Sequence, residues 1–322
     1  MIATHLHFGK SWSIFEYMSS TLLQAKDLTH LYSPGKGADK VSISVEPGEV
    51  VGFIGPNGAG KTTTISMLTG LLTPQSGSLE ILGQPLQQKS DFTSIYSELG
   101  YLPSDSSYYK GISAEAMIDY AIELRNGDQK ALRKQAHSFA SRLDLDITKK
   151  ISKLSLGNKR KVGIILSIFF NPKLIIMDEP TTGLDPLVQK ETLEILNEMS
   201  NQGAGVLLSS HNLAEVDQIC DRVIIIKAAQ VIFSDKVSAI KKLAQKRIRF
   251  EFGASATMTQ IEAVTNKIGK LTDGEVIVLE NHGELLSNKA SEVVSLLISE
   301  GISEFTVENP SLEKMFINYY KK

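Results

Sequence analysis

The chain contains 322 residues, which is long enough for two domains and a well-buried core. Hydrophobic residues make up 42% and charged residues 22%, as in ordinary globular proteins. The net charge of −2 gives no general positive field, so no nucleic-acid partner is expected. The single cysteine, Cys220, excludes an internal disulfide.

Residues 1–21 are expected to form an N-terminal extension. The first 17 residues show no clear hydrophobic period and no continuous apolar region of the signal-peptide kind. A second methionine, Met18, begins a stretch that is a more natural start of the protein. They are an extension or a misplaced start, with a frayed terminus as the alternative. The longest apolar stretch, residues 162–170, has about half of the ~20 residues that a membrane span requires. Any action at a membrane would therefore depend on a partner chain.

Residues 22–240 carry a mixed pattern of strands and helices. VSISV alternates as a half-buried strand does, and three apolar runs fit buried strands of a mostly parallel sheet: VVGFIG, LIIMD and GVLLSS. Between them, residues 104–165 are helical in composition, with helices predicted over 113–125 and 128–143. The pattern predicts an α/β fold whose mostly parallel sheet carries a helical insert.

The pattern changes after residue 240. KKLAQKR is a basic connector, and RIRFEF, EVIVLE and EFTVEN are typical of strands. Each strand is followed by a helical pattern, and the last predicted helix is SLEKMFINYY. Residues 241–322 are therefore expected to form a small C-terminal α+β accessory domain of βαβαβα order.

A glycine-rich loop follows the predicted strand VVGFIG. GPNGAGKTT, residues 55–63, fits the pattern G-x-x-x-x-G-K-[ST] of a P-loop NTPase core, in which backbone N–H groups surround a phosphate at a helix N-terminus. The lysine would reach the β- and γ-phosphates, and the first threonine would ligate Mg²⁺. An accidental glycine turn is the alternative, but the preceding strand and following helix argue against it. The candidate nucleotide-binding residues here are Gly55, Pro56, Asn57, Gly58, Ala59, Gly60, Lys61, Thr62 and Thr63.

Two adjacent carboxylates end the predicted strand LIIMD. Ligand sites of parallel sheets lie at the carboxyl ends of the strands, where Asp178 would hold Mg²⁺ and Glu179 would act as general base on a water molecule. A solvated strand end is the alternative. The upstream phosphate loop favours the catalytic interpretation.

LSLGN, residues 154–158, opens a predicted helix that extends to residue 170. Ser155 and the amides near Gly157 form a helix N-terminus that can bind phosphate, although an ordinary serine N-cap has the same sequence. The order of motifs decides between them. Over about residues 22–235, the sequence resembles the nucleotide-binding domain of ABC ATPases, because it has the same motifs in the same order. They are the phosphate loop, LSxG, the acidic strand, GLDP at 183–186, and His211 after GVLLSS.

The resemblance implies further roles for matched residues. Tyr32 would stack on adenine, and Asp185 would connect two sites across a dimer. Ser155, Gly157 and Asn158 would close on ATP held by another subunit. His211 would contact the γ-phosphate and orient the water with Glu179.

The sequence departs from the family at two places. The signature is usually LSGGQ, whereas Leu156 and Asn158 replace its first glycine and its glutamine here. In GYLPSDSSYY, Ser104 occupies the position of a glutamine that touches Mg²⁺ and senses the membrane subunit. The serine is too short for that direct contact, so its role stays open between partner sensing and none. SLEKMF near the C-terminus resembles the SLE-x-x-F ending of drug-resistance and bacteriocin-immunity exporters.

The resemblance therefore predicts an ATPase with ATP and Mg²⁺ as cofactors. It would form a dimer with a second ATPase subunit and power transport, in the export direction, through a multi-span membrane permease on the cytoplasmic face of the cell membrane. Three alternatives are weighed against this. A soluble ABC ATPase of translation or DNA maintenance usually has two motor domains or a long coiled coil, and neither pattern is present. A nucleotide sensor without turnover would not need Glu179 and His211, and a GTPase would carry NKxD rather than NKRK.

Overall fold

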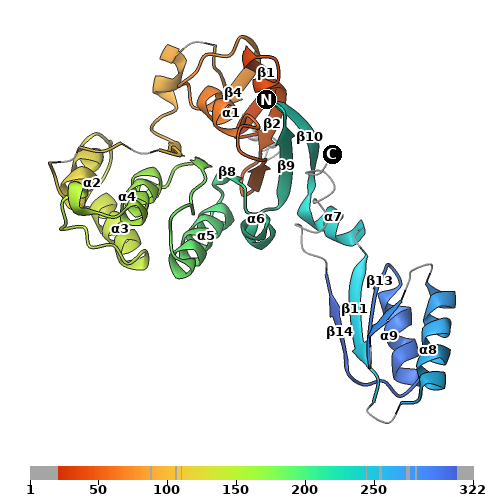
Figure 1. Cartoon of the computed structure of the whole chain (residues 1–322). Coiled ribbons are helices and arrows are strands. Elements are labelled where there is room, and N and C mark those ends of the chain that lie inside the picture. Colours follow the sequence, from red (N-terminus) through yellow and green to blue (C-terminus); the bar gives the residue numbers. More distant parts are fainter. Residues whose placement is uncertain are drawn as a thin grey trace, which may run out of the picture.

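The computed structural model describes residues 21–309, apart from residues 88, 106, 110, 244, 254–255, 273–275 and 280. Most of the extension predicted for residues 1–21 and the helix predicted for 311–320 lie outside this range. Figure 1 shows a larger body made of β1–β10 and α1–α7, and a smaller one made of β11–β14, α8 and α9. Among the described residues, no helix combines the length and the apolar character needed to cross a membrane.

A six-stranded sheet forms the centre of the larger body. Its strands are parallel except for the edge strand β10, which runs antiparallel to β9. The order across the sheet is β10 (Gln230–Lys236), β9 (Arg222–Lys227), β3 (Val50–Ile54), β8 (Gly205–Ser210), β7 (Leu174–Asp178) and β6 (Leu99–Leu102). Every residue of β3, β7 and β8 is buried, which explains their continuous apolar sequences. The α/β class predicted from these runs is confirmed.

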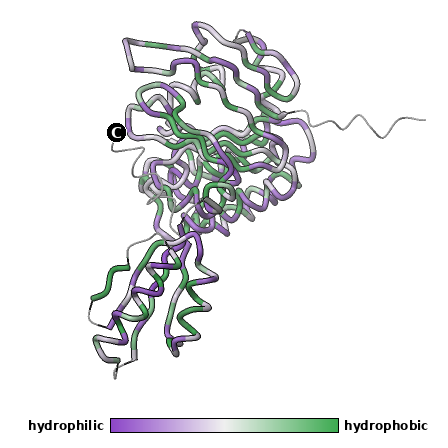
Figure 2. Tube along the Cα trace, turned by 90° about the vertical axis from the view of Figure 1, so that its right-hand side faces the viewer, coloured by the Kyte–Doolittle hydropathy of each residue, from purple (hydrophilic) through white to green (hydrophobic). Residues whose placement is uncertain are grey.

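Alternate side chains of the central strands enter two separate cores. Val50 and Ile54 of β3 pack with the helices on one face, whereas Val51 and Phe53 pack on the other. Figure 2 shows these apolar strands running through the interior of the larger body. The helices around the sheet include α1 (Lys61–Leu68), α5 (Pro186–Asn201) and α6 (Leu213–Ile219). Because both faces are covered, the site must form where the strands end.

A four-stranded antiparallel sheet covers the second core. Its order is β2 (Lys36–Val45), β1 (Leu23–Ser33), β4 (Ser76–Ile81) and β5 (Gln84–Pro85). A 3-10 helix, η1 (Lys89–Ser94), follows and leads to β6. VSISV lies in β2, and its three apolar side chains, Val41, Ile43 and Val45, are buried as the alternation predicts.

Three helices of the insert lie together beside the sheet (Figure 1): α2 (Ala114–Glu123), α3 (Gln129–Arg142) and α4 (Leu156–Ile168). A short 3-10 helix, η2 (Ile151–Lys153), precedes α4. Ser113, Asp128 and Ser155 are the N-caps of the three helices, and each side chain accepts a bond from a first-turn amide. These caps explain why the helices begin at the positions that the spacing of apolar residues predicts.

The smaller body has its own core and differs in one element from the prediction. Its order is β11 (Lys246–Glu251), α8 (Met258–Leu271), β12 (Ile277–Leu279), β13 (His282–Ser287), α9 (Ala290–Ser299) and β14 (Phe305–Glu308). The helix predicted between EVIVLE and EFTVEN is present as α9, but a strand that was not predicted, β13, precedes it and pairs with β12 as an antiparallel hairpin. Gly283 of β13 packs under the Phe250 ring, where a Cβ atom would lie 2.2 Å from the ring. The described order is thus βαββαβ, with both helices on one face of the sheet.

The boundary predicted between residues 240 and 241 falls inside α7 (Val237–Leu243). Val237 and Ile240 pack against the core of the larger body. Lys241 forms an ion pair of 2.5 Å with Asp217 of α6. α7 therefore belongs to the larger body at least as far as Lys241.

Candidate functional site

The phosphate loop joins β3 to α1 and passes very close to the backbone of β2. Gly60, the residue before the helix, has φ of 113°, and a Cβ atom there would lie 2.1 Å from the Gly37 carbonyl oxygen. Only glycine fits that position. Pro56, Asn57 and Gly58 are exposed at the rim, whereas Gly55 and Ala59 are buried beneath them. The loop thus presents its backbone outward at the start of a helix.

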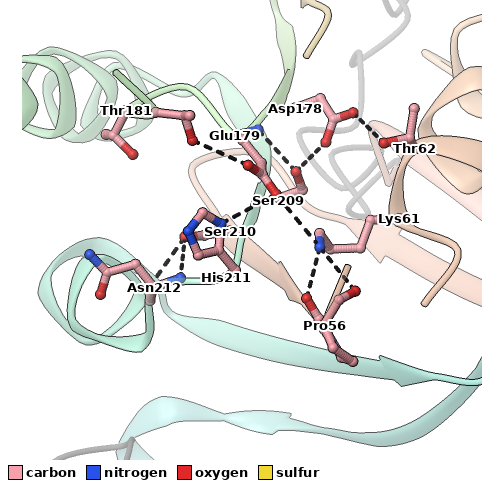
Figure 3. A network of polar contacts seen from close by, with 12 residues as sticks. Pro56, Lys61, Thr62, Asp178, Glu179, Thr181, Ser209, Ser210, His211 and Asn212 are labelled. Atoms are coloured by element: carbon pink, nitrogen blue, oxygen red, sulfur yellow. Dashed lines mark hydrogen bonds and ion pairs between the residues drawn. The ribbon is translucent and has the colours of Figure 1, made fainter. Parts of the chain in front are cut away.

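Lys61 opens α1 and lies almost fully buried under this loop. Its ammonium group donates to the carbonyl oxygens of Gly55 at 2.7 Å and Pro56 at 3.4 Å (Figure 3). It also lies 3.6 Å from Oε1 of Glu179. The positive charge is therefore fixed between the loop and the end of β7.

Asp178 is buried at the end of β7, where two hydroxyl groups hold its carboxylate. Thr62 Oγ1 donates to Oδ2 at 2.8 Å, and Ser209 of β8 donates to Oδ1. Burial first, and then the charge of Asp178, raise the pKa of Tyr101 to about 12. A threonine hydroxyl and a carboxylate side by side at a phosphate loop are the hard oxygen ligands that Mg²⁺ prefers, so the residues fit this ion.

The next residue, Glu179, has a constrained backbone. Its φ of 52° places it in the left-handed region, which is uncommon for a residue other than glycine. Its N–H donates to Ser209, to the side-chain oxygen at 3.0 Å and the carbonyl oxygen at 3.2 Å. Such a conformation persists only where surrounding bonds hold it, and it turns the Glu179 carboxylate toward the phosphate loop.

Three side chains surround the Glu179 carboxylate. His211 Nδ1 lies 3.3 Å from Oε1, and Thr182 Oγ1 donates to Oε2 at 3.2 Å, while Lys61 approaches from the loop. Burial raises the pKa of Glu179, but His211, Lys61 and Thr182 outweigh that effect and bring the pKa below its usual value. The carboxylate is therefore ionised at neutral pH and can accept a proton or a hydrogen bond from water.

Glu215 of α6, which belongs to none of the sequence motifs, holds the segment that carries His211. Its buried carboxylate accepts from Thr181 at 2.8 Å, Ser210 at 2.9 Å and Asn212 at 3.1 Å. Thr181 follows Glu179 along the chain, and Ser210 and Asn212 flank His211. One carboxylate thereby fixes the two loops that bring Glu179 and His211 together.

The signature residues cap and open α4, which lies apart from α1, the helix that follows the phosphate loop (Figure 1). Ser155 caps the helix by accepting from Asn158 N at 3.2 Å. A Cβ atom on Gly157 would lie 2.6 Å from the carbonyl oxygen of Gly183, so glycine permits this close approach of the GLDP loop. Leu156 is 75% exposed. The structure therefore does not bring the signature of this chain to its own phosphate loop.

Comparisons with known proteins support the same interpretation. A protein-family profile described as "ABC transporter" matches residues 38–182. An ABC transporter ATP-binding protein of Bacillus subtilis is 31% identical over 70% of this chain and 75% of its own length. The chain belongs to the ATP-binding proteins of ABC transporters. This ABC protein binds ATP and hydrolyses it.

Other relatives match this ABC protein over nearly its whole length. The bacitracin transport ATP-binding protein of Bacillus licheniformis is 28% identical over 92% of this chain and 97% of the relative. The linearmycin resistance ATP-binding protein of Bacillus subtilis is 27% identical over the same shares. A solved ATP-binding subunit of an ABC transporter has a TM-score of 0.63 and 32% identity, over 69% of this chain and 92% of that structure. A dimeric cassette with ADP and Pi, 21% identical, shares the fold with a TM-score of 0.61, over 67% of this chain and 98% of that one.

Two further predicted site residues of this ABC protein have simple local settings. Tyr32 of β1 is 65% exposed, with its ring edge-on to His30 at 5.0 Å. Its exposed ring is accessible to a flat base. Asp185 caps α5 by accepting from Val188 N at 3.1 Å. Capping is the role that the structure shows for Asp185.

Ser104 is held through its backbone. The side chain is exposed, whereas its carbonyl oxygen accepts from Arg160 at 2.9 Å. Arg160, Ser209 and Glu215 also lie around the predicted site residues, although no motif indicates them. They stand in the segments NKRK and SSHNLAE, but the role of each depends on partners that are distant along the chain.

Proposed function

We propose that two copies of this protein bind and hydrolyse ATP between them and power export through a separate membrane permease. The observation that carries this proposal is the division of the site within one copy. Lys61, Asp178, Glu179 and His211 converge at the strand ends, whereas the Ser155 helix N-terminus lies elsewhere on the same chain. A helix N-terminus suits phosphate, so a second copy facing the first in head-to-tail fashion would complete each site.

Each residue of the strand-end cluster has a role in this proposal. The loop amides of residues 55–63 and Lys61 bind the phosphates, and Tyr32 stacks on adenine. Thr62 and Asp178 would hold Mg²⁺, which would neutralise charge on the phosphate oxygens. Glu179 accepts a hydrogen bond from the attacking water, and His211 fixes the Glu179 carboxylate and faces the γ-phosphate.

The relatives that match over both bodies support export. Their names associate them with bacitracin transport and linearmycin resistance, and they align with 92% of this chain, including the smaller body. We propose compounds of this kind as cargo and residues 22–243 as the ATPase part, with the C-terminal body as an accessory domain. The permease would place the protein at the cytoplasmic face of the membrane.

A susceptibility assay tests the proposal. Cells that lack the gene are complemented with the wild type, with Glu179→Gln or with Glu191→Gln as a control on α5. The proposal expects that the wild type and the control restore growth in bacitracin or linearmycin, and that Glu179→Gln does not. Equal growth of the Glu179→Gln strain in every compound would contradict the proposal.

A further inference from the structure

Arg160 of α4 contacts a set of backbone carbonyl groups that no motif connects. Its Nη1 donates to Pro103 O at 2.5 Å and Ser104 O at 2.9 Å. Its Nη2 donates to Asp178 O and to Glu179 O at 2.7 Å, and Nε donates to Pro180 O at 3.3 Å. One guanidinium group thus joins the segment after β6 to the segment after β7.

The electrostatics of this contact are unusual for a buried cation. Arg160 is only 6% exposed, and burial lowers its pKa even though the charges of Asp178, Glu179 and Asp105 oppose that effect. Its hydrogen bonds go to neutral carbonyl dipoles, which compensate for lost hydration less well than a carboxylate. A buried charge held in this way is costly, so a purely packing role is better served by an apolar side chain.

The position of the contact relative to Glu179 indicates what it does. Glu179 has a left-handed backbone, whose N–H is held by Ser209 and whose carbonyl oxygen is held by Arg160. The two bonds fix the backbone of Glu179 from both sides. The direction of its carboxylate toward Lys61 and His211 therefore depends on where the guanidinium lies.

We propose that Arg160 is a positioning residue that sets the orientation of Glu179 and ties it to the Ser104 loop. A shift of residues 103–104 moves the guanidinium, and the guanidinium moves the peptide that carries Glu179. Since Arg160 lies just beyond the signature on α4, a displacement of that helix reaches the same peptide. The linkage uses the Ser104 backbone, so the short side chain at this position does not interrupt it.

The planar fork of arginine is necessary for this task. A guanidinium group has five N–H donors in a fixed plane, and here they meet five carbonyl oxygens from two segments. Lysine retains the charge but has three donors around one nitrogen, so it cannot span both segments. Arg160→Lys is therefore the informative variant, because it separates charge from geometry.

The first experiment measures kcat and the dissociation constant for ATP separately. Arg160→Lys and Arg160→Ala are expected to lose about 10²-fold in kcat, the scale of a misplaced catalytic group, with ATP affinity within about 3-fold of the wild type. Lys161→Ala is the matched control, since Lys161 is a buried cation on the same helix that donates to Asp144 O at 3.1 Å, away from β7. Full activity of Arg160→Lys, or an equal loss in Lys161→Ala, would overturn the proposal.

Two further measurements distinguish positioning from a general structural role. Guanidinium ions at millimolar concentration should restore part of the kcat of Arg160→Ala, whereas neutral urea should not; equal effects of both would overturn the proposal. Hydrogen exchange at the Ser104 and Asp105 amides should be faster in Arg160→Lys than in the wild type. Unchanged exchange there would contradict the link to the loop even where kcat falls, and the Lys variant supplies this result if Arg160→Ala does not fold.

Discussion

At the scale of single residues, Lys61 carries the positive charge that the phosphate loop offers to ATP. Lys61→Ala is expected to weaken ATP binding by about 10- to 150-fold, because a charge-assisted hydrogen bond is worth ~1.5–3 kcal/mol. Calorimetric titration with a non-hydrolysable analogue measures this. Lys173→Ala removes an exposed ion pair with Glu98 and serves as the control. Unaltered affinity in Lys61→Ala would remove this residue from the phosphate site.

The ionisation of Glu179 gives a second prediction at this scale. His211 is the main group that lowers the pKa of Glu179 against the effect of burial, so His211→Ala should raise that pKa toward or above its usual value. The depressed pKa contributes stability above the usual pKa, and that contribution is lost as pH falls through the folded value. In His211→Ala this contribution should shrink or vanish, because the folded pKa of Glu179 no longer lies below the usual value.

Carboxyl NMR titration of Glu179 in the wild type and in His211→Ala checks this direction. Glu198 provides an internal control, since the hydrogen bond from Arg142 lowers its pKa independently of the site. The idea fails if the pKa of Glu179 stays constant or falls while that of Glu198 is unchanged.

Sequence motifs indicate a site residue when its contacts are local along the chain or when it lies at the end of a buried strand. Lys61 and Thr62 follow from the loop pattern, and Asp178 follows from the end of a buried strand. Arg160 could not be predicted in the same way, because its acceptors lie 57 and 18 residues away in sequence and are backbone atoms. Backbone carbonyls leave no residue-type signal in a sequence.

At the scale of elements, Glu215 connects α6 with the ends of β7 and β8. Glu215→Ala would leave the donors Thr181, Ser210 and Asn212 without this acceptor, which should lower the free energy of unfolding by about 2–3 kcal/mol. It should also lower kcat, because the His211 segment is released. Chemical denaturation and steady-state assays measure both. Glu194→Ala, which removes an exposed pair with Lys190, should change stability by under about 0.5 kcal/mol.

Elements were predictable where burial or capping leaves a pattern in the sequence. The buried strands β3, β7 and β8 appear as apolar runs, and Ser113 and Asp128 mark where α2 and α3 begin. β13 could not be predicted because two of its three buried positions are Gly283 and Ser287, whereas the apolar Leu286 is exposed. A short strand of this composition carries no clear apolar alternation.

At the scale of the whole molecule, the separate core around Ile248 and Val293 predicts that the smaller body is dispensable for nucleotide binding. A chain that ends after residue 243 retains all of α7 and the Lys241–Asp217 pair. It should stay folded and bind ATP within about 3-fold of the full chain, because no site residue has been removed. Thermal unfolding and nucleotide titration test this. A folded truncation that has lost ATP binding would show that the smaller body contributes to the site.

The last prediction concerns the division of the site between two copies. Lys61→Ala damages the phosphate loop of a copy, and Ser155→Arg blocks the helix N-terminus that it offers to its partner. At an ATP concentration that Lys61→Ala cannot bind, each variant alone should show little activity, since both sites of its dimer carry the lesion. In a mixed dimer, one site contains both lesions and the other contains neither, because each site takes its loop from one copy and its signature from the other. Equal mixing should therefore restore up to about a quarter of wild-type activity by random pairing. Mixing each variant with itself at the same total concentration is the control, and the absence of any recovery despite dimers in light scattering would contradict a shared site.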